Sequence, residues 1–230
     1  MVTRLRYDAA HHFRLALADA LSEAGPDAPT LCTGWRTAQL AAHLYVRENN
    51  PLSLPGIAGL HGSVGKVATA LTEHAMDDAL SRHGFQGLVD RFRAGPRPWS
   101  PMALPGADRL GNTLEYFVHL HDVTDAVPSR RATADQTNAL SPSVRDELWQ
   151  RMPPLARMVL RRSPVGVQLV RPGTVSRRAR IVATRGLPMV IVRGSVDQLA
   201  LWMFGRSARV ELIGDADSVA RVSAVVAEGV

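Results

Sequence analysis

Cysteine is almost absent from this sequence, aromatic residues are few, and no long apolar run occurs. The only thiol, Cys32, cannot form an internal disulfide, and a single cysteine excludes a zinc site built from several thiolates. No run of eighteen apolar residues is present, so we expect no transmembrane helix. The chain starts without an apolar segment of the signal-peptide kind, which predicts a cytoplasmic protein. Hydrophobic residues still make up 46% of the 230 residues, enough for a sizeable buried core.

Positive charge is carried almost entirely by arginine and is concentrated in the C-terminal part of the chain. Lys66 is the only lysine among 27 basic residues. Residues 1–136 contain 13 basic and 14 acidic side chains, whereas residues 137–230 contain 14 and 7 and have a net charge of +7. Only 5% of the residues are aromatic, and no recognition motif accompanies the arginines. A small anionic partner is therefore favoured over nucleic acid.

The first half of the chain has the apolar spacing of helices. The helix-breaking residues Gly25-Pro26, Pro51 and Pro128 divide this half into separate segments. The predicted helices cover residues 3–24, 37–48, 64–83 with a continuation over 85–94 after Gly84, and 107–126. Four helices of this length are typical of a bundle.

Short β-rich runs appear only in the second half, after a polar linker. We predict strands at residues 165–170, 179–183, 189–192 and 209–213, and helices at 143–162, 196–204 and 215–227. Helices followed by a mixed strand and helix region predict an α+β fold. We expect a helical domain at residues 1–136 and a small α/β domain at residues 137–230.

The last helix of the first half carries a polar stripe beside its apolar one. The stripe is Asn112, Glu115, His119 and Asp122, at spacings that place all four on one helix face. Glu115 and His119 lie one turn apart, so both can bind one metal ion. An ordinary surface pair is the alternative interpretation of this spacing.

His43 is the candidate for a third ligand. Its neighbours Leu40 and Leu44 belong to an apolar helix face, so His43 should point inward with them. A buried histidine that only makes a hydrogen bond is the alternative. If His43 meets the polar stripe around Glu115, it can bind the same metal ion as Glu115 and His119.

Three segments of the sequence together resemble a known family: Leu31-Cys-Thr-Gly-Trp35, Leu40-Ala-Ala-His43-Leu44, and the stripe from Asn112 to Asp122. The chain resembles the DinB-like superfamily, and most closely its actinobacterial branch of mycothiol-dependent maleylpyruvate isomerase-like metal-binding proteins. The resemblance implies an N-terminal four-helix bundle and a small C-terminal α/β domain. It also implies a divalent metal, usually zinc, bound by His43, Glu115 and His119.

Two functions follow from this resemblance and remain open. One is a metal- and thiol-dependent isomerase or transferase, with mycothiol as the implied thiol and a small anionic electrophile as substrate. A metal-bound thiol loses its proton and becomes a nucleophile at neutral pH. The other is a non-catalytic module that binds a metal or a ligand, since one fold supports many functions.

An anionic substrate needs a cation, and the charge distribution places it in the C-terminal domain. Arg206 is the first candidate, because Gly205 ends the preceding helix and leaves the next side chain free to project. A surface arginine that stabilises a helix end is the alternative.

Four further side chains have predicted roles around the ligands. Asp122 can orient the imidazole of His119, whereas His121 projects about 200° away from His119 around the helix. We expect Cys32 to be a small packed residue, with a nucleophile as the alternative, and His12 to be a packed histidine, with a pocket residue as the alternative.

Overall fold

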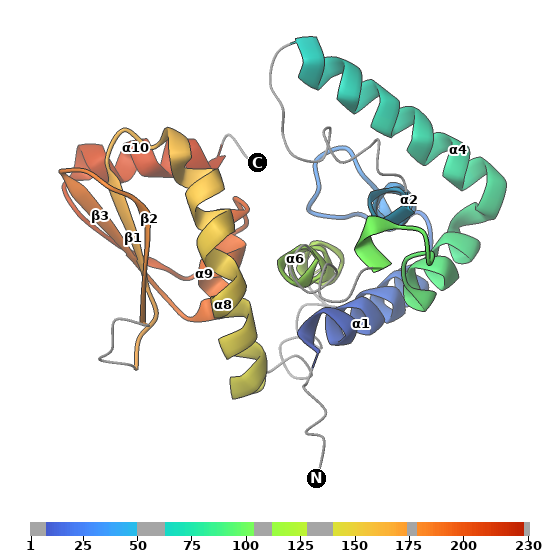
Figure 1. The fold of residues 1–230 in the computed structure, drawn as a ribbon, viewed down its shortest axis with the longest axis horizontal. Coiled ribbons are helices and arrows are strands. Elements are labelled where there is room, and N and C mark those ends of the chain that lie inside the picture. Colours follow the sequence, from blue (N-terminus) through green and yellow to red (C-terminus); the bar gives the residue numbers. More distant parts are fainter. Residues whose placement is uncertain (1–7, 50–62, 104–111, 128–139, 174–178, 228–230) are drawn as a thin grey trace. The chain divides into compact units, whose positions relative to one another are not determined.

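The computed structural model describes residues 8–49, 63–103, 112–127, 140–173 and 179–227, and the fold is α+β (Figure 1). The chain divides into two compact units, unit 1 at Met1–Ala139 and unit 2 at Leu140–Val230. The sequence predicted the division after residue 136, which lies outside the described residues.

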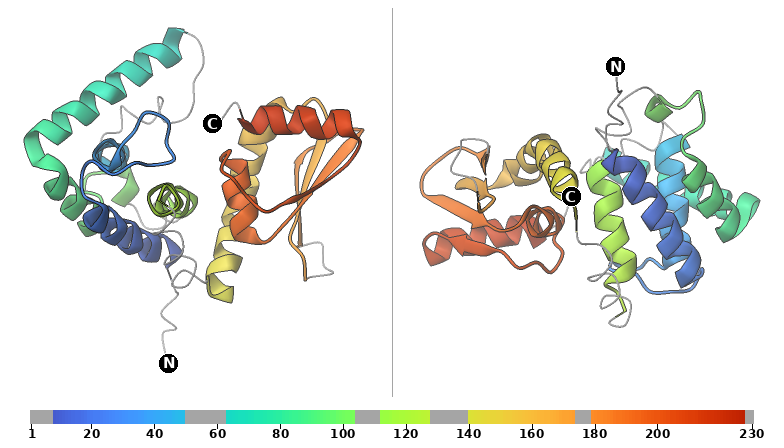
Figure 2. Two further views of the ribbon diagram at one scale, coloured as in Figure 1. Left: turned by 180° about the vertical axis from the view of Figure 1, so that it is seen from behind. Right: turned by 90° about the horizontal axis from the view of Figure 1, so that it is seen from below.

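Unit 1 is helical. Its elements are α1 (Ala9–Ala24), α2 (Thr37–Asn49), α4 (Ser63–Ala94), the 3-10 turn η2 (Pro101–Ala103) and α6 (Thr113–Thr124). Helix α1 packs against α6 and α4, and α2 packs against α4 (Figures 1 and 2). The predicted first turns at residues 3–7 and 107–111 lie outside the described residues. Among the helices that the structure describes, none is long and apolar enough to cross a membrane.

Gly84 interrupts α4, as the sequence predicted. Its φ of 64° and ψ of 169° are not helical. A positive φ costs glycine little because it has no Cβ. The chain therefore changes direction there without an unfavourable residue.

The buried face of α1 differs from the predicted one. Phe13, Leu17 and Leu21 are buried, whereas Ala16 and Ala20 of the predicted stripe are only half-buried. Leucine removes more apolar area from water than alanine, and this favours the observed rotation of the helix. The prediction that His12 is packed was wrong, because its side chain is exposed.

A charged group lies inside the core of unit 1. The Arg14 guanidinium donates to both carboxylate oxygens of Glu48, at 2.7 and 2.8 Å, and to the Tyr116 hydroxyl at 2.8 Å. Arg14 is 3% exposed, Glu48 1% and Tyr116 0%. The three residues belong to α1, α2 and α6, so the network ties these helices together.

Unit 2 consists of helices and one four-stranded sheet. Its elements are α8 (Pro142–Val159), the turn η3 (Leu160–Arg162), β1 (Gly166–Val170), β2 (Arg180–Thr184), β3 (Met189–Arg193), α9 (Val196–Met203), β4 (Glu211–Ile213) and α10 (Ala216–Ala227). The strand order is β2-β1-β3-β4. Strands β1 and β3 are parallel, and the two outer pairs are antiparallel. All four predicted strands are confirmed, with ends shifted by up to two residues.

One face of the sheet forms the core of unit 2. Val167, Leu169, Ile181, Val190 and Val192 alternate with more exposed residues and are buried. Helix α8 packs against β2 and α9, and α10 packs against β3 (Figure 1). The period-2 burial is the pattern of a sheet covered on one face.

Candidate metal centre

Helix α2 brings His43 to the inside of unit 1, as its apolar neighbours predicted. Leu40 and Leu44 are 0% exposed and His43 is 8% exposed. The Trp35 ring, from the loop before α2, lies 5.0 Å from the His43 ring and forms one wall beside it. Leu31 N–H donates to the Asp122 carbonyl at 3.0 Å, which fastens this loop to α6.

Helix α6 presents the polar stripe on the face predicted from its spacing. Glu115 and His119 are half-buried, with side chains 15% and 12% exposed. Asp122 is completely buried one turn further along. The apolar residues Leu114, Phe117 and Val118 are buried beside this stripe. The polar side chains are therefore held by a well-packed helix.

The two predicted histidine ligands approach the same carboxylate oxygen of the third ligand, Glu115. Glu115 Oε1 lies 3.2 Å from His43 Nε2 and 3.2 Å from His119 Nε2. The donor atoms of all three lie within 4.8 Å of one another. Tetrahedral zinc at its usual bond lengths separates its ligand atoms by about 3.3 to 3.6 Å. The two distances to Glu115 Oε1 are close to this separation, so the trio could hold one metal ion.

Asp122 orients His119. Its Oδ2 lies 2.9 Å from Nδ1, on the side of the ring opposite Glu115. A carboxylate that accepts from Nδ1 fixes the tautomer in which Nε2 can bind a metal. The predicted role of Asp122 agrees with this geometry.

Burial and close contacts act in opposite directions on the titratable groups of the cluster. Burial favours neutral Glu115, but Arg47 and the hydrogen bonds with His119 and His43 hold the pKa of the carboxyl well below its ordinary value. Burial also opposes the charged form of His119, yet hydrogen bonds with Asp122, Cys32 and Glu115 hold its pKa well above the ordinary value. For His43 burial prevails over the hydrogen bond with Glu115, and its pKa is lowered. The contacts thus favour the ionised form of Glu115 and the charged form of His119, whereas burial favours the neutral form of His43.

Arg47 is a cation of this site that the sequence analysis missed. Its Nε lies 3.6 Å from Glu115 Oε1 and donates to Asn112 Oδ1 at 3.2 Å. It follows His43 by one helical turn, and this spacing is the signal that could have identified it. The net charge of a region does not locate individual cations, so the near-neutral first half still places an arginine beside Glu115.

Cys32 is not only a packed residue, because its thiol makes a polar contact with the polar stripe of α6. Its thiol donates to Asp122 Oδ2 at 3.1 Å, and Sγ lies 3.8 Å from His119 Nδ1. The donor atoms of Cys32, His119 and Asp122 form a second trio that could hold a metal. His119 belongs to both trios but faces them with different ring nitrogens.

Two other predicted residues lie elsewhere. His121 contacts Asp125, at 3.2 Å, and the Phe117 ring, consistent with its predicted direction away from His119. Arg206 follows α9 in unit 2, where Gly205 takes a φ of 70° and ends the helix. The Arg206 guanidinium donates to the Phe204 carbonyl at 2.8 Å, a contact typical of an arginine at a helix C-terminus.

No family model, no curated protein and no solved structure matches this chain. The interpretation of the cluster therefore depends on its geometry and on the motifs in its sequence. The geometry identifies a trio of ligand atoms, and the choice of reaction depends on the motifs alone.

Proposed function

We propose that unit 1 is a DinB-like four-helix bundle that holds one divalent metal ion through His43, Glu115 and His119. We further propose that the protein is a thiol-dependent isomerase or transferase. One observation carries the proposal: imidazole nitrogens from two helices approach a single carboxylate oxygen, Glu115 Oε1, at 3.2 Å each. His43 and Glu115 are 72 residues apart in the sequence, so tertiary packing creates this meeting.

The donor set supports zinc in a catalytic setting. Two imidazoles and one carboxylate are typical of catalytic zinc sites, which keep a position open for water or substrate. Structural zinc sites are closed by four protein ligands, commonly including cysteine. The second trio requires the Cys32 thiol to lose its proton and requires Asp122 to give up its hydrogen bond with His119. We therefore assign the ion to the trio that contains Glu115.

The chain's own side chains hold and orient this site. When bound, the metal would lower the pKa of a coordinated thiol and supply a thiolate at neutral pH. Asp122 directs Nε2 of His119 toward Glu115, Arg47 keeps Glu115 ionised, and Trp35 covers one side of His43. Mycothiol is the thiol that the motif resemblance implies. We place the protein in the cytoplasm, where free thiols persist.

A small anionic electrophile is the proposed substrate, and Arg206 is the proposed carboxylate-binding residue. A planar guanidinium binds a carboxylate through two parallel hydrogen bonds. Replacing Arg206 with Ala should weaken binding of the anionic substrate and leave the zinc content unchanged. Arg209→Ala, which removes an exposed arginine from the same segment, is the matched control. Equal affinity in the wild type, Arg206→Ala and Arg209→Ala would show that Arg206 does not bind the substrate.

The experiment that tests the function combines metal analysis with a turnover assay. Protein purified without chelator should contain a divalent metal, and the zinc-loaded protein should convert maleylpyruvate or a related electrophile only when mycothiol is present. Turnover should be lost in Glu115→Ala and retained in Glu23→Ala, a change at an exposed position on α1.

The alternatives have distinct outcomes in the same experiment. Saturable binding of thiol to the metal-loaded protein without turnover would assign the non-catalytic module. Protein that contains no metal and gains no stability from Zn²⁺ would contradict both functions.

A further inference from the structure

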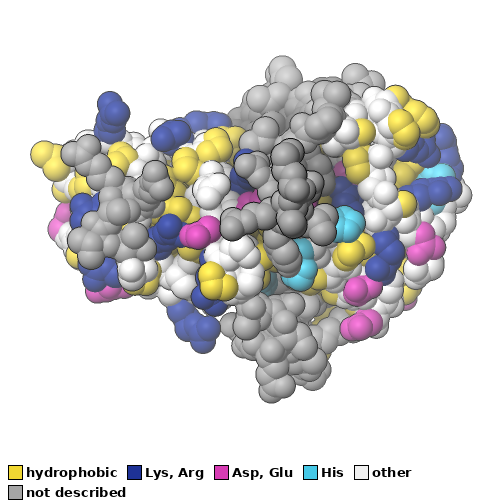
Figure 3. Space-filling view, turned by 60° about the horizontal axis from the view of Figure 1, so that its bottom comes forward, with side chains coloured by type: hydrophobic (Ala, Val, Ile, Leu, Met, Phe, Trp, Pro, Cys, Tyr) yellow, Lys and Arg dark blue, Asp and Glu magenta, His cyan; other side chains and the backbone are white. Residues whose placement is uncertain are grey.

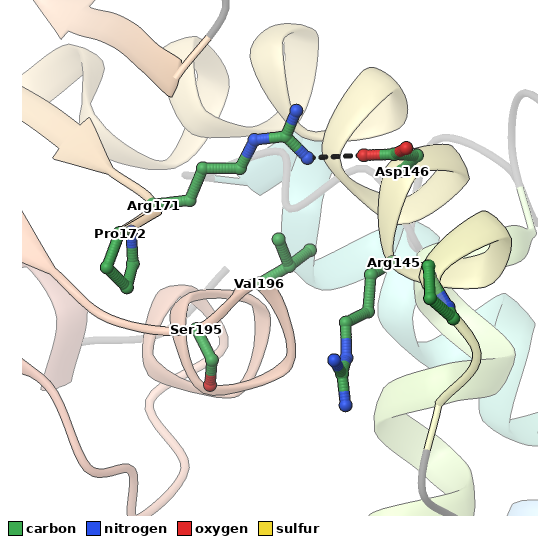
Figure 4. Close-up of a pocket in the computed structure, with 7 residues that line it drawn as sticks. Arg145, Asp146, Arg171, Pro172, Ser195 and Val196 are labelled. Carbon is green, nitrogen blue, oxygen red and sulfur yellow. Dashed lines mark hydrogen bonds and ion pairs between the residues drawn. The ribbon is translucent and has the colours of Figure 1, made fainter. Parts of the chain in front are cut away.

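Unit 2 contains a pocket of about 450 Å³ that the proposed metal chemistry does not use. It lies between the first turn of α8, the end of β1 and the start of α9 (Figure 4). Its lining includes Pro142, Arg145, Asp146, Arg171, Ser195 and Val196. All of these residues belong to unit 2.

Arg145 supplies an uncommitted positive charge to this pocket. Its side chain is exposed, and among the described residues its guanidinium has no hydrogen-bond or ion-pair partner. In Figure 4 the side chains of Arg145 and Ser195 extend toward the same side of the pocket. A guanidinium in this position can bind an oxyanion through two N–H groups.

The start of α9 adds neutral donors. Ser195 is the N-cap residue, with the extended backbone usual there, but its hydroxyl makes no capping hydrogen bond. The amides of the first helical turn have no partner within a helix, and the helix dipole favours negative charge at this end. The Ser195 hydroxyl and these amides are therefore available to an anion in the pocket.

Arg171 forms a fixed wall of the pocket. Its Nη1 lies 2.6 Å from Asp146 Oδ1, and its guanidinium lies over the Trp149 ring at 5.3 Å. Its buried Nε has no hydrogen-bond partner. Two arginines and one aspartate give the lining a charge of +1, which suits a ligand group with a single negative charge.

We propose that this pocket binds the oxyanion group of a small molecule, a carboxylate or a phosphate. Arg145 is its ionic partner, and Ser195 and the first-turn amides of α9 donate the remaining hydrogen bonds. Residues 137–230 carry a net charge of +7, which raises the local concentration of anions. On the face drawn in Figure 3, Lys and Arg side chains lie at several separate places. The proposal is independent of the metal centre.

The first test is an NMR titration of the full-length protein with inorganic phosphate and, separately, with succinate. The amides of Ser195 and Val196 should shift in the wild type, and the ligand that shifts them at lower concentration identifies the oxyanion. In Arg145→Gln the dissociation constant should rise tenfold or more, as expected for a lost charged hydrogen bond. Arg157→Gln removes an exposed arginine from the same helix outside the pocket and should leave it unchanged. If the Ser195 and Val196 amides do not shift, or if Arg145→Gln and Arg157→Gln bind the oxyanion with equal affinity, the proposal is overturned.

Two further variants separate binding from folding. Ser195→Ala should weaken binding without lowering the melting temperature, because no capping bond is lost. Asp146→Asn removes the negative charge from the lining and should strengthen binding. Weaker binding in Asp146→Asn, or unchanged binding in Ser195→Ala, would contradict the assignment of these residues.

Discussion

Unit 1 contains two polar clusters that both include residues of α2 and α6, and the two clusters are built differently. In the first, Arg14 is surrounded by acceptors: Glu48 of α2, Tyr116 of α6 and the Phe92 carbonyl at 2.8 Å. Opposite charges meet there, and its side chains are almost completely sealed from water. A paired and sealed cluster of this kind holds helices in place.

The second cluster uses the same two helices at nearby positions. On α2, His43 lies between one and two turns before Glu48, and on α6, Glu115 directly precedes Tyr116. The ligand atoms of His43, Glu115 and His119 meet at one point, and their side chains are 10 to 15% exposed. Three Lewis bases that converge repel one another unless a proton or a metal lies between them. The chemical type of the partners, more than burial, therefore separates the structural cluster from the proposed binding site.

The largest expected effect is on stability, in the sealed cluster. Arg14→Met leaves the Glu48 carboxylate buried without its ion-pair partner, and the free energy of unfolding should fall by about 3–5 kcal/mol. Urea denaturation monitored by circular dichroism measures it. The double variant Arg14→Met/Glu48→Met should recover most of the loss, because no unpaired charge remains. If Arg14→Met lowers the free energy of unfolding by less than about 1 kcal/mol, the value typical of an exposed ion pair, the cluster is accessible to water in solution.

Removal of a metal ligand should affect zinc affinity strongly and protein stability little. His43→Ala should lower zinc affinity by more than about 100-fold, the upper range for residues that only support a ligand. It should change the stability of the metal-free protein far less than Arg14→Met does. Competition with a chromophoric chelator measures the affinity, and His74→Ala, at an exposed position on α4, serves as the control. If the two histidine variants bind zinc equally well, His43 is a packed core residue.

Asp122 should affect the metal through His119. Asp122→Asn removes the carboxylate that accepts from Nδ1, and zinc affinity should fall about 10- to 100-fold. The same chelator competition detects this change. An unaltered affinity would show that packing alone fixes the orientation of His119.

Zinc binding should depend on pH in a direction set by His119. Its pKa is raised, chiefly by Asp122, Cys32 and Glu115 acting against burial, so at lower pH a proton occupies a nitrogen that the metal needs. Affinity should therefore fall as pH falls, by about tenfold per unit while one proton is displaced, and level off above that pKa. Calorimetry in buffers of different ionisation enthalpy measures the released proton. No proton release near pH 7 would mean that His119 is already neutral there.

The smallest effect is expected at Cys32. Its thiol contacts Asp122 and Nδ1 of His119, and in our assignment it does not bind the metal. Cys32→Ser keeps a donor to Asp122 and should change zinc affinity only a few-fold. A loss as large as that of His43→Ala would place the ion in the trio of Cys32, His119 and Asp122 instead.

Much of the fold was predictable because periodicity is a local property. The strands of unit 2 and the stripe on α6 follow from period-2 and period-3.6 patterns in the sequence. The inward direction of His43 followed from Leu40 and Leu44 on the same helix. These features require no knowledge of which helices are neighbours.

The features that sequence reasoning missed depend on partners far along the chain. Arg14 is a charged residue on a helix face, and its burial depends on Glu48 and Tyr116, which lie 34 and 102 residues away. Cys32 reaches Asp122 across 90 residues through a loop without a regular pattern. Arg47 had a local signal, the spacing from His43, but its partner Glu115 is defined only by packing. Tertiary contacts determine which polar residues become buried.

X-ray absorption spectroscopy of the zinc-loaded protein tests the central claim most directly, because it distinguishes the two trios by their ligand atoms. The account predicts one zinc ion with nitrogen and oxygen neighbours at about 2.0–2.2 Å, the scattering pattern of two imidazoles, and no sulfur. A zinc–sulfur distance of about 2.3 Å, or a protein that retains no zinc, would contradict it.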